Sequence, residues 1–392
     1  MSSQSHAQLS SLTTILPNAV ANRVLESVIA EAGFPTFCSN ARGTLLHDHW
    51  FKRMFPPISP VKTLVEMIIP SDKVDTATAA IVRESRLDQQ AVGAIYSIDY
   101  DQAWMSADSP VHIAQESQQN TGRVAESAQK LRIVFCVVGH AQSEKIAKAA
   151  IEHGAHGPII SYAEGRGLRD RLGWLRITKD HEQEVMTILA DEEDVDDLID
   201  VLAKAGEFHL PGRGFMYSLP ISKGLFNIPS RIAGHHHAAS MQQVIHAIDQ
   251  LSGHTNWRDQ DIFDVGFNGR SSGIKSLARQ SSYQRNRHCL SLIATRSDLQ
   301  RVTDILLDLG APGLNISFIR HAHQTSETAI GDEWVKLQSV LDADLAQRIY
   351  DEIACNAEDN GLRKVFIGTT PVPLVASYVP GKKDYRKPRA AA

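Results

Sequence analysis

The chain contains no long apolar run, and its first residues lack the features of a secretory signal. No stretch approaches the ~20 apolar residues that a transmembrane helix needs. Residues 1–11 are rich in Ser and Gln, without the charged and apolar regions that direct export. The net charge of -5 gives no reason to expect a general nucleic-acid binder. These absences predict a cytoplasmic protein with no membrane insertion and no nucleic-acid partner.

Cysteine is scarce, and no two cysteines form a CxxC pair. The four are Cys38, Cys136, Cys289 and Cys355. This spacing is not that of a zinc or redox site. Cys136 and Cys289 stand in apolar, strand-like runs, where a small buried thiol fits. We expect all four to be structural thiols.

Enzyme motifs are missing as well. No GxSxG, HExxH, Walker-type GxxxxGK[ST] or GxGxxG motif lies in a strand-to-helix setting. Asp, Glu and His are plentiful, but their spacing singles out no catalytic pair. The sequence therefore predicts a sensor or binding protein rather than an enzyme.

What the chain does contain is one order of elements three times over: strand, helix, strand, polar loop, strand, helix, strand. In copy one the strands are expected at 12–17, 34–46, 61–70 and 93–100, and the helices at 18–32 and 72–87. Copy two repeats the order from Leu131 to about Asn227, and copy three from His288 to about Val379. Copies one and two are about 120 residues apart, and such a period marks a domain-sized unit rather than a solenoid repeat.

Residue patterns agree with half-buried sheets covered by helices. The run Ile133–Val138 is apolar and β-branched, as in a buried strand. Val195, Leu198, Ile199 and Leu202 recur at helical spacing, which predicts one buried helix face. Two strand–helix–strand halves form a ferredoxin-like split βαβ unit. The predicted fold class is α+β, with three tandem ferredoxin-like domains; three unrelated α/β domains are the alternative.

The domain boundaries follow from composition. The prediction is a first repeat at 9–105, a linker at 106–130, a second repeat at 131–228, an insert at 229–287, a third repeat at 288–380 and a basic tail at 381–392.

Two glycine-containing stretches of copy two are its most specific features. Tyr162-Ala-Glu-Gly-Arg-Gly167 resembles the base of the T-loop of PII signalling proteins, and Pro211-Gly-Arg-Gly-Phe-Met-Tyr-Ser-Leu-Pro-Ile221 resembles their phosphate-binding B-loop and fourth strand. PII proteins are trimers that bind adenine nucleotides between subunits. The resemblance therefore implies a single-chain pseudo-trimer with three non-equivalent clefts. It also implies an adenine nucleotide (ATP, ADP or AMP, with Mg²⁺ as a candidate accompanying ion) as ligand, and 2-oxoglutarate or bicarbonate as a candidate second effector.

The residues of these stretches suit a phosphate. Glycines let the backbone approach closely, and successive N–H groups can form an anion-binding concavity. An arginine between them adds a charged contact. The alternative is a plain turn with solvated arginines. The candidate nucleotide-binding residues are Gly165, Arg166, Gly167, Arg169, Gly212, Arg213 and Gly214, with Gly361, Arg363 and Lys364 in copy three.

The copies depart from the family pattern to different degrees. The family has a lysine after its second B-loop glycine, where copy two has Phe215. Copy three offers Gly361-Leu-Arg-Lys364, and copy one keeps little beyond Gly93. We therefore expect one or two of the three clefts to bind nucleotide.

The loops after the second strands, 47–60, 168–182 and 324–332, correspond to T-loops. The first contains Trp50, Phe51, Arg53 and Phe55, residue types that often anchor interfaces. The resemblance implies that such a loop controls a partner protein, for example a membrane transporter. The alternative is that these side chains pack on their own domain.

Two further readings of function stay open. A ligand-free interaction scaffold of the same fold would explain the degenerate glycine loops. A metal-responsive protein would use the run His235–His237, but three adjacent histidines cannot readily face one ion, so no metal site is assigned.

Overall fold

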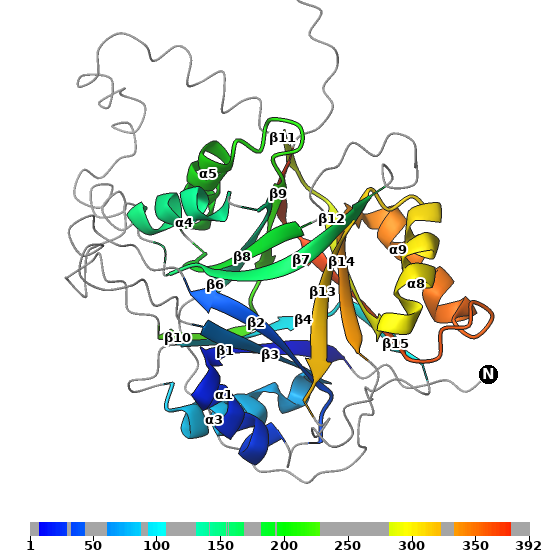
Figure 1. Cartoon of the computed structure of the whole chain (residues 1–392), viewed down its shortest axis with the longest axis horizontal. Coiled ribbons are helices and arrows are strands. Elements are labelled where there is room, and N and C mark those ends of the chain that lie inside the picture. Colours follow the sequence, from blue (N-terminus) through cyan, green and yellow to red (C-terminus); the bar gives the residue numbers. More distant parts are fainter. Residues whose placement is uncertain are drawn as a thin grey trace, which may run out of the picture.

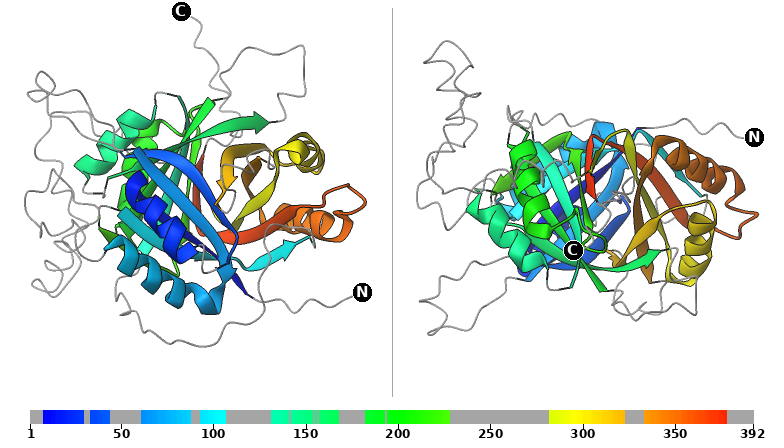
Figure 2. Two further views of the ribbon diagram at one scale, coloured as in Figure 1. Left: turned by 60° about the horizontal axis from the view of Figure 1, so that its bottom comes forward. Right: turned by 90° about the horizontal axis from the view of Figure 1, so that it is seen from above.

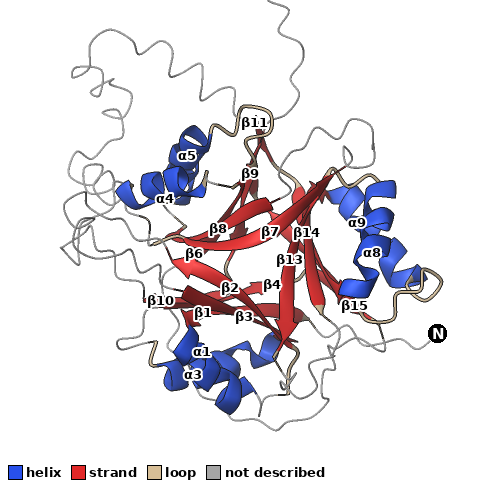
Figure 3. Cartoon of the chain, in the orientation of Figure 1, coloured by secondary structure: helices blue, strands red, loops and turns tan. Residues whose placement is uncertain are grey.

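The computed structural model describes residues 8–29, 33–43, 61–87, 93–106, 131–140, 142–153, 155, 157–167, 182–192, 194–227, 282–322 and 333–377. Over these ranges the chain is a mixed α+β protein in which the strands form one large antiparallel sheet of 16 strands. The strands meet in the middle of the molecule, and three pairs of helices cover the outside (Figures 1 and 3). No helix in the described part of the chain is long and apolar enough to cross a membrane.

The elements fall into three groups along the chain. Unit one comprises β1 (Leu9–Pro17), α1 (Asn18–Val24) with a following π-helical turn (Leu25–Ile29), β2 (Thr36–Gly43), β3 (Val61–Pro70), a 3₁₀ turn (Ser71–Lys73), α3 (Val74–Ser85), β4 (Gly93–Asp99) and β5 (Gln102–Met105). Unit two comprises β6 (Leu131–Gly139), α4 (Ser143–Glu152), β7 (Ile159–Gly167), β8 (Glu182–Asp191), α5 (Val195–Gly206), β9 (Phe215–Pro220) and β10 (Lys223–Asn227).

Unit three comprises β11 (Ser282–Gln284), β12 (Arg287–Thr295), a 3₁₀ turn (Arg296–Asp298), α8 (Leu299–Asp308), β13 (Gly313–His321), β14 (Trp334–Asp342), α9 (Ala343–Asn356), β15 (Val365–Val372) and β16 (Leu374–Ser377). Strand β11 lies inside the segment 229–287 that was expected to be an insert. Each unit has the expected order of strand, helix, strand, strand, helix, strand. In unit three this order begins after β11.

The strand pairing is the same in each unit. The first strand lies between the third and fourth, and the second strand lies outside the third. The orders are β4-β1-β3-β2, β9-β6-β8-β7 and β15-β12-β14-β13, all antiparallel. Three stretches of sequence thus build the same four-stranded arrangement.

Each unit then sends one more strand onto a neighbour, which the sequence reading missed. Strand β5 of unit one pairs with β15 of unit three, β10 of unit two with β4 of unit one, and β16 of unit three with β9 of unit two. The second strands also meet, because β2, β7 and β13 pair with one another. The exchange is cyclic, so every unit both gives and receives a strand.

The helices pack by their apolar faces onto the outer side of their own strands (Figure 2). In α5 the four residues predicted from helical spacing, Val195, Leu198, Ile199 and Leu202, are buried as expected. Each helix pair closes a separate core: α1 and α3, α4 and α5, and α8 and α9. A further cluster on the inner faces contains residues from all three units, including Ile15, Ile133 and Cys289.

The thiols provide a test of this burial. Cys38, Cys136 and Cys289 are buried, while Cys355 is exposed on α9, so the expectation of four structural thiols is wrong for Cys355. Burial raises the pKa of Cys136 to about 12, and burial raises the pKa values of Cys38 and Cys289 to about 11. An ordinary thiol has a pKa of about 8.5.

Only Cys355 should therefore react rapidly with a thiol reagent at pH 8. Thiolate is the reactive form, and a raised pKa keeps the other three thiols protonated at this pH. Mass spectrometry after timed alkylation should show one modified thiol in buffer and four in denaturant. Fast modification of a second cysteine in buffer would contradict the described packing.

Candidate functional site

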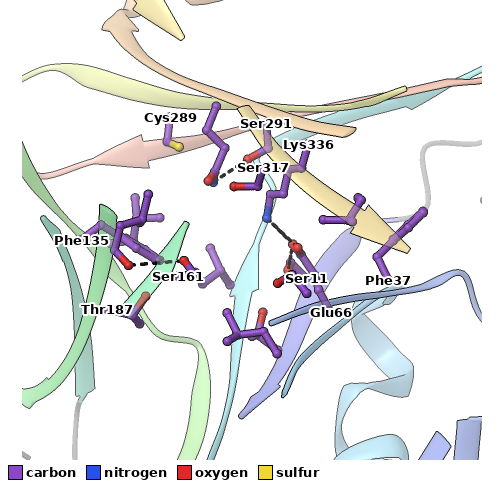
Figure 4. Close-up of a pocket in the computed structure, with 18 of the residues that line it drawn as sticks. Ser11, Phe37, Glu66, Phe135, Ser161, Thr187, Cys289, Ser291, Ser317 and Lys336 are labelled. Carbon is purple, nitrogen blue, oxygen red and sulfur yellow. Dashed lines mark hydrogen bonds and ion pairs between the residues drawn. The ribbon is translucent and has the colours of Figure 1, made fainter. Parts of the chain in front are cut away.

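A polar cavity of about 90 Å³ lies where the inner faces of the three units meet. Figure 4 shows its wall, which combines hydroxyl, amide, thiol and charged side chains from different strands. Its polar lining residues are Ser11, Thr13, Ser39, Glu66, Tyr96, Tyr100, Ser161, Thr187, Cys289, Ser291, Ser317, Lys336, Gln338 and Thr370. The centre of the molecule thus combines an apolar cluster with a group of polar side chains.

One ion pair crosses this cavity between units one and three. The ammonium group of Lys336 on β14 lies 2.6 and 2.7 Å from the two carboxylate oxygens of Glu66 on β3. Ser11 donates a third hydrogen bond to the same carboxylate at 2.7 Å, and Figure 4 shows all three side chains converging. The side chains of Lys336 and Glu66 are only 15% and 13% exposed, so water screens their attraction weakly.

Tyrosines close the cavity on the same side. Burial, reinforced by the charge of Glu66, raises the pKa of Tyr96 and of Tyr100 above that of an ordinary phenol. Both hydroxyls therefore stay protonated at neutral pH and can donate hydrogen bonds. The one carboxylate and the one ammonium in the lining of this cavity neutralise each other.

Size decides what this cavity can hold. About 90 Å³ corresponds to roughly three water molecules at ~30 Å³ each. Pockets for cofactor-sized ligands are usually about 300–1,000 Å³. The cavity is thus smaller than a typical nucleotide pocket, and none of the predicted nucleotide-binding residues that the structure describes lines it.

The predicted glycine loop of unit two contains two left-handed glycines. Gly212 and Gly214 both adopt left-handed conformations, with φ of 78° and 105°. A Cβ added to Gly214 would lie 2.1 Å from the carbonyl oxygen of Val137, so only glycine fits there. Arg213 is exposed between them, and its guanidinium lies 3.2 Å from the carboxylate of Glu207.

The other predicted stretch of unit two lies elsewhere on the same unit. Gly165, Arg166 and Gly167 end β7 and pair with the start of β13 of unit three. Strands β8 and β6 lie between β7 and β9, so the two glycine stretches do not form facing walls of one cleft. Each stretch instead meets a segment of another unit.

At the junction of units one and two, the end of β2 meets the start of α4. Arg42 donates to the buried carboxylate of Glu184 at 3.0 Å, and Ser143 donates to the same carboxylate at 2.5 Å. The first turn of α4 also contacts the residues next to the glycine loop. Lys145 of α4 lies 3.6 Å from Glu207, which is the ion-pair partner of Arg213. The base of the first T-loop thus shares a helix with the glycine loop of unit two.

The junction of units two and three repeats this arrangement. Arg166 donates to Gln300 of α8 at 3.1 Å, and the next residue, Arg301, donates to the carbonyl of Gly361 at 3.0 Å. Gly361 has a left-handed φ of 69°, like Gly212. Arg363 and Lys364 follow it and are both exposed. The helix α8 thus contacts both Arg166 of unit two and Gly361 of unit three.

The register of the third glycine loop differs from the one expected. Phe215 pairs with Ser377, and Phe366 pairs with Met105, so these two phenylalanines are equivalent. Gly361 is the counterpart of Glu207, because both have a left-handed φ and the same two backbone hydrogen bonds close the turn at each. Gly361 precedes Phe366 by five residues and Glu207 precedes Phe215 by eight, so the third loop is three residues shorter. Lys364 consequently aligns with Arg213 rather than with Phe215, to which an ungapped reading assigned it.

The first glycine loop keeps one structural feature. A Cβ added to Gly93 would lie 2.4 Å from the carbonyl oxygen of Ile15, as at Gly214 and Val137. The residues just before Gly93, 88–92, lie outside the described part of the chain, so this cleft cannot be compared further.

Other predicted residues also lie outside the described ranges. They are Arg169, the loop residues Trp50, Phe51, Arg53 and Phe55, and the histidines His235–His237. Among the residues that are described, no group of three or more His, Cys, Asp or Glu side chains is arranged to hold a metal ion.

Comparison with known proteins identifies no family. No protein-family model and no curated protein matches the chain. Solved structures with weak likeness include an unknown protein from Galdieria sulphuraria (8% identity, 51% of this chain, 92% of that one, TM-score 0.16). They also include an anthrone oxidase-like protein (9% identity, 60% of this chain, 97% of that one, TM-score 0.17). A third is a bacterial light-regulated adenylyl cyclase (10% identity, 61% of this chain, 71% of that one, TM-score 0.14). TM-scores this low support no conclusion about fold or function.

Proposed function

We propose that this chain is a PII-like regulatory protein, a single-chain pseudo-trimer of three ferredoxin-like domains that binds an adenine nucleotide between its units. The cyclic strand exchange supports a pseudo-trimer, since each unit completes its neighbour's sheet. The observation that carries the ligand proposal is the left-handed backbone of Gly212 and Gly214 around the exposed Arg213.

Binding would exchange one partner of Arg213 for another. In the absence of ligand, Glu207 neutralises this guanidinium, with the two side chains 45% and 36% exposed. An exposed ion pair contributes about 0–1 kcal/mol, so it is easily replaced. A phosphate group presents more acceptor oxygens and matches the guanidinium fork, and the glycine N–H groups add further donors. In this proposal Glu207 occupies the guanidinium of Arg213 until a phosphate group replaces it.

Control of a partner would follow from the position of the T-loops. The base of the first T-loop, at Arg42, and the glycine loop of unit two share α4, and Arg166 and Gly361 share α8 in the same way. A nucleotide that contacts both segments would favour one state of the attached loop, provided that its affinity differs between the states. A protein partner, for example a transporter, would read this state.

Thermal unfolding of the whole chain with ATP, ADP or AMP, with and without Mg²⁺, tests the proposal. A ligand at 100 times its Kd stabilises the fold by about 2.7 kcal/mol, which shifts the midpoint measurably. Arg213→Ala should weaken binding about tenfold or more. Arg23→Ala is the matched control, because Arg23 is also an exposed arginine near a glutamate, Glu84, away from both junctions. No shift with any nucleotide at millimolar concentration would contradict the proposal and leave the ligand-free scaffold.

A further inference from the structure

The central cavity keeps hydrogen-bonding groups that no described residue uses. Within the described ranges, the hydroxyls of Ser39, Thr187 and Ser317 form no hydrogen bond. The same holds for Oε1 of Gln338, whose amide nitrogen donates to Ser291 at 3.3 Å. None of these four groups is among the fully buried polar atoms that lack a partner, so each keeps accessible surface in the cavity. All four can therefore contact a bound molecule.

Lys336 contributes one more donor to this set. Two of its three N–H groups suffice for the two carboxylate oxygens of Glu66, at 2.6 and 2.7 Å. Its third N–H has no acceptor in the part of the chain that the structure describes. Ser317 lies directly opposite Lys336 in the pairing of β13 with β14. An ammonium N–H forms stronger hydrogen bonds than a neutral donor, so it is the preferred partner for an oxygen of the ligand.

The side of the cavity formed by unit two is mainly apolar. Phe135, Val185 and Leu219 line it, and Figure 4 shows Phe135 across the cavity from Lys336. A buried water molecule is usually held by two to four polar partners. Water next to these side chains finds few of them, so this side favours a molecule with a small apolar part.

The balance of charge defines the class of that molecule further. Glu66 and Lys336 are the only ionisable acid and base in the lining, and they neutralise each other. A charged ligand would bring a net charge into a site without a free counter-ion, which is costly. The cavity therefore favours an uncharged molecule.

The fold itself does not require this arrangement. Each unit places one serine on its second strand at the same register in the cavity lining: Ser39, Ser161 and Ser317. The residues paired with them on the third strands are Leu64, Val185 and Lys336. Two units thus have an aliphatic residue where unit three has the ammonium, so the polar side is particular to this cavity.

Volume limits the ligand to a few atoms. A cavity of about 150 Å³ holds benzene, so the central cavity of about 90 Å³ suits about four non-hydrogen atoms. A primary amide of this size has a carbonyl acceptor, two N–H donors and a short alkyl group. These match the ammonium of Lys336, the free oxygen of Gln338 and the apolar side.

We propose that the central cavity binds a short-chain primary amide. Its carbonyl oxygen accepts from Lys336, its NH₂ group donates to Oε1 of Gln338, and its alkyl group lies against Phe135. The hydroxyls of Ser39 and Ser317 supply further hydrogen bonds. The site is separate from the nucleotide site, so neither proposal depends on the other.

Calorimetric titration of the whole chain with acetamide, acetate and acetamidinium tests the proposal. The three compounds have the same shape and differ in charge. We expect acetamide to bind with a Kd of about 1 mM or below, which is within the limit for a ligand of about four non-hydrogen atoms. Acetate and acetamidinium should each bind at least about tenfold more weakly, because both are charged.

Two variants place the binding in the cavity. Gln338→Met removes an acceptor at similar volume and should weaken acetamide binding about tenfold, and Ser317→Ala should weaken it about threefold. Ser27→Ala is the control, because the hydroxyl of Ser27 donates to the backbone oxygen of Arg23 at 2.8 Å, outside the cavity. This control should bind acetamide like the wild type.

The thermal midpoint of each variant without ligand confirms that it is folded, and Ser317→Ala keeps the test valid where Gln338→Met is unstable. No binding of acetamide at about 10 mM would overturn the proposal, because the cavity would then hold only water. Acetate or acetamidinium binding as tightly as acetamide would overturn it too. So would equal affinities of the wild type and both cavity variants, since acetamide would then bind elsewhere.

Discussion

Removing either charge of the Glu66–Lys336 pair is expected to lower the free energy of unfolding by about 3 kcal/mol. Glu66→Gln leaves an ammonium without its counter-ion beside the central cavity, and Lys336→Met leaves a carboxylate held only by Ser11. Both side chains are at least 85% buried, so water compensates little for the lost partner. Urea denaturation of each variant measures the change.

The double variant Glu66→Met/Lys336→Met separates the value of the pair from the cost of breaking it. A buried ion pair replaced by apolar residues is often neutral, so the double variant should lose less stability than the two single variants added together. Glu84→Gln, which breaks the exposed pair with Arg23, should change stability by about 0–1 kcal/mol. Single variants no worse than this control would contradict the burial of the central pair.

Gly214→Ala is expected to destabilise the protein by about 2–3 kcal/mol. The added Cβ would lie 2.1 Å from the backbone oxygen of Val137, and the φ of 105° is unfavourable for any side chain. A side-chain rotation cannot relieve a contact with a backbone atom, so β6 or the loop has to move. Nucleotide affinity should fall with the loop geometry, even where the variant remains folded.

Two glycines provide controls for this substitution in thermal or chemical unfolding. Gly139→Ala places its Cβ in open space and should change stability by less than about 0.5 kcal/mol. Gly212→Ala has a φ of 78° to overcome and should cost about 1 kcal/mol. A Gly214 variant as stable as the Gly139 variant would mean that the loop does not have the described conformation.

Local patterns predicted the elements of the fold well. Strand β3 covers 61–70 as expected, and the buried face of α5 is the one that helical spacing indicated. Such features depend on residues close in sequence, and periodicity records them directly. The first helix, expected at 18–32, is an α-helix over Asn18–Val24 followed by a π-helical turn up to Ile29, and residues 30–32 lie outside the described ranges.

Features that depend on contacts between units were not predicted from the sequence. Strands β5, β10 and β16 have only four or five residues each and pair with strands of another unit, so no local period marks them. The pairing of Glu66 with Lys336 joins residues 270 positions apart. A signal was present for Glu66, because its charge interrupts the apolar run 64–69, where a neutral residue is usual. Its partner could only be found in three dimensions.

The glycine loops were predicted as residues but not as a site. Gly212 and Gly214 have left-handed conformations, while Gly165–Gly167 pair with β13 of unit three and lie apart from them. The alignment of Lys364 with Arg213 rather than with Phe215 could not be seen in the sequence, because the two loops differ in length.

The stoichiometry of nucleotide binding to the whole chain tests the central claim most directly. Calorimetric titration with the nucleotide that stabilises the protein most should give one or two sites per chain, because only the loops of Arg213 and Lys364 retain an exposed cation beside a left-handed glycine among the described residues. Arg213→Ala should remove one site, and Arg363→Ala/Lys364→Ala should remove the other where two are found. Three equal sites, or a stoichiometry unchanged by both variants, would contradict the account.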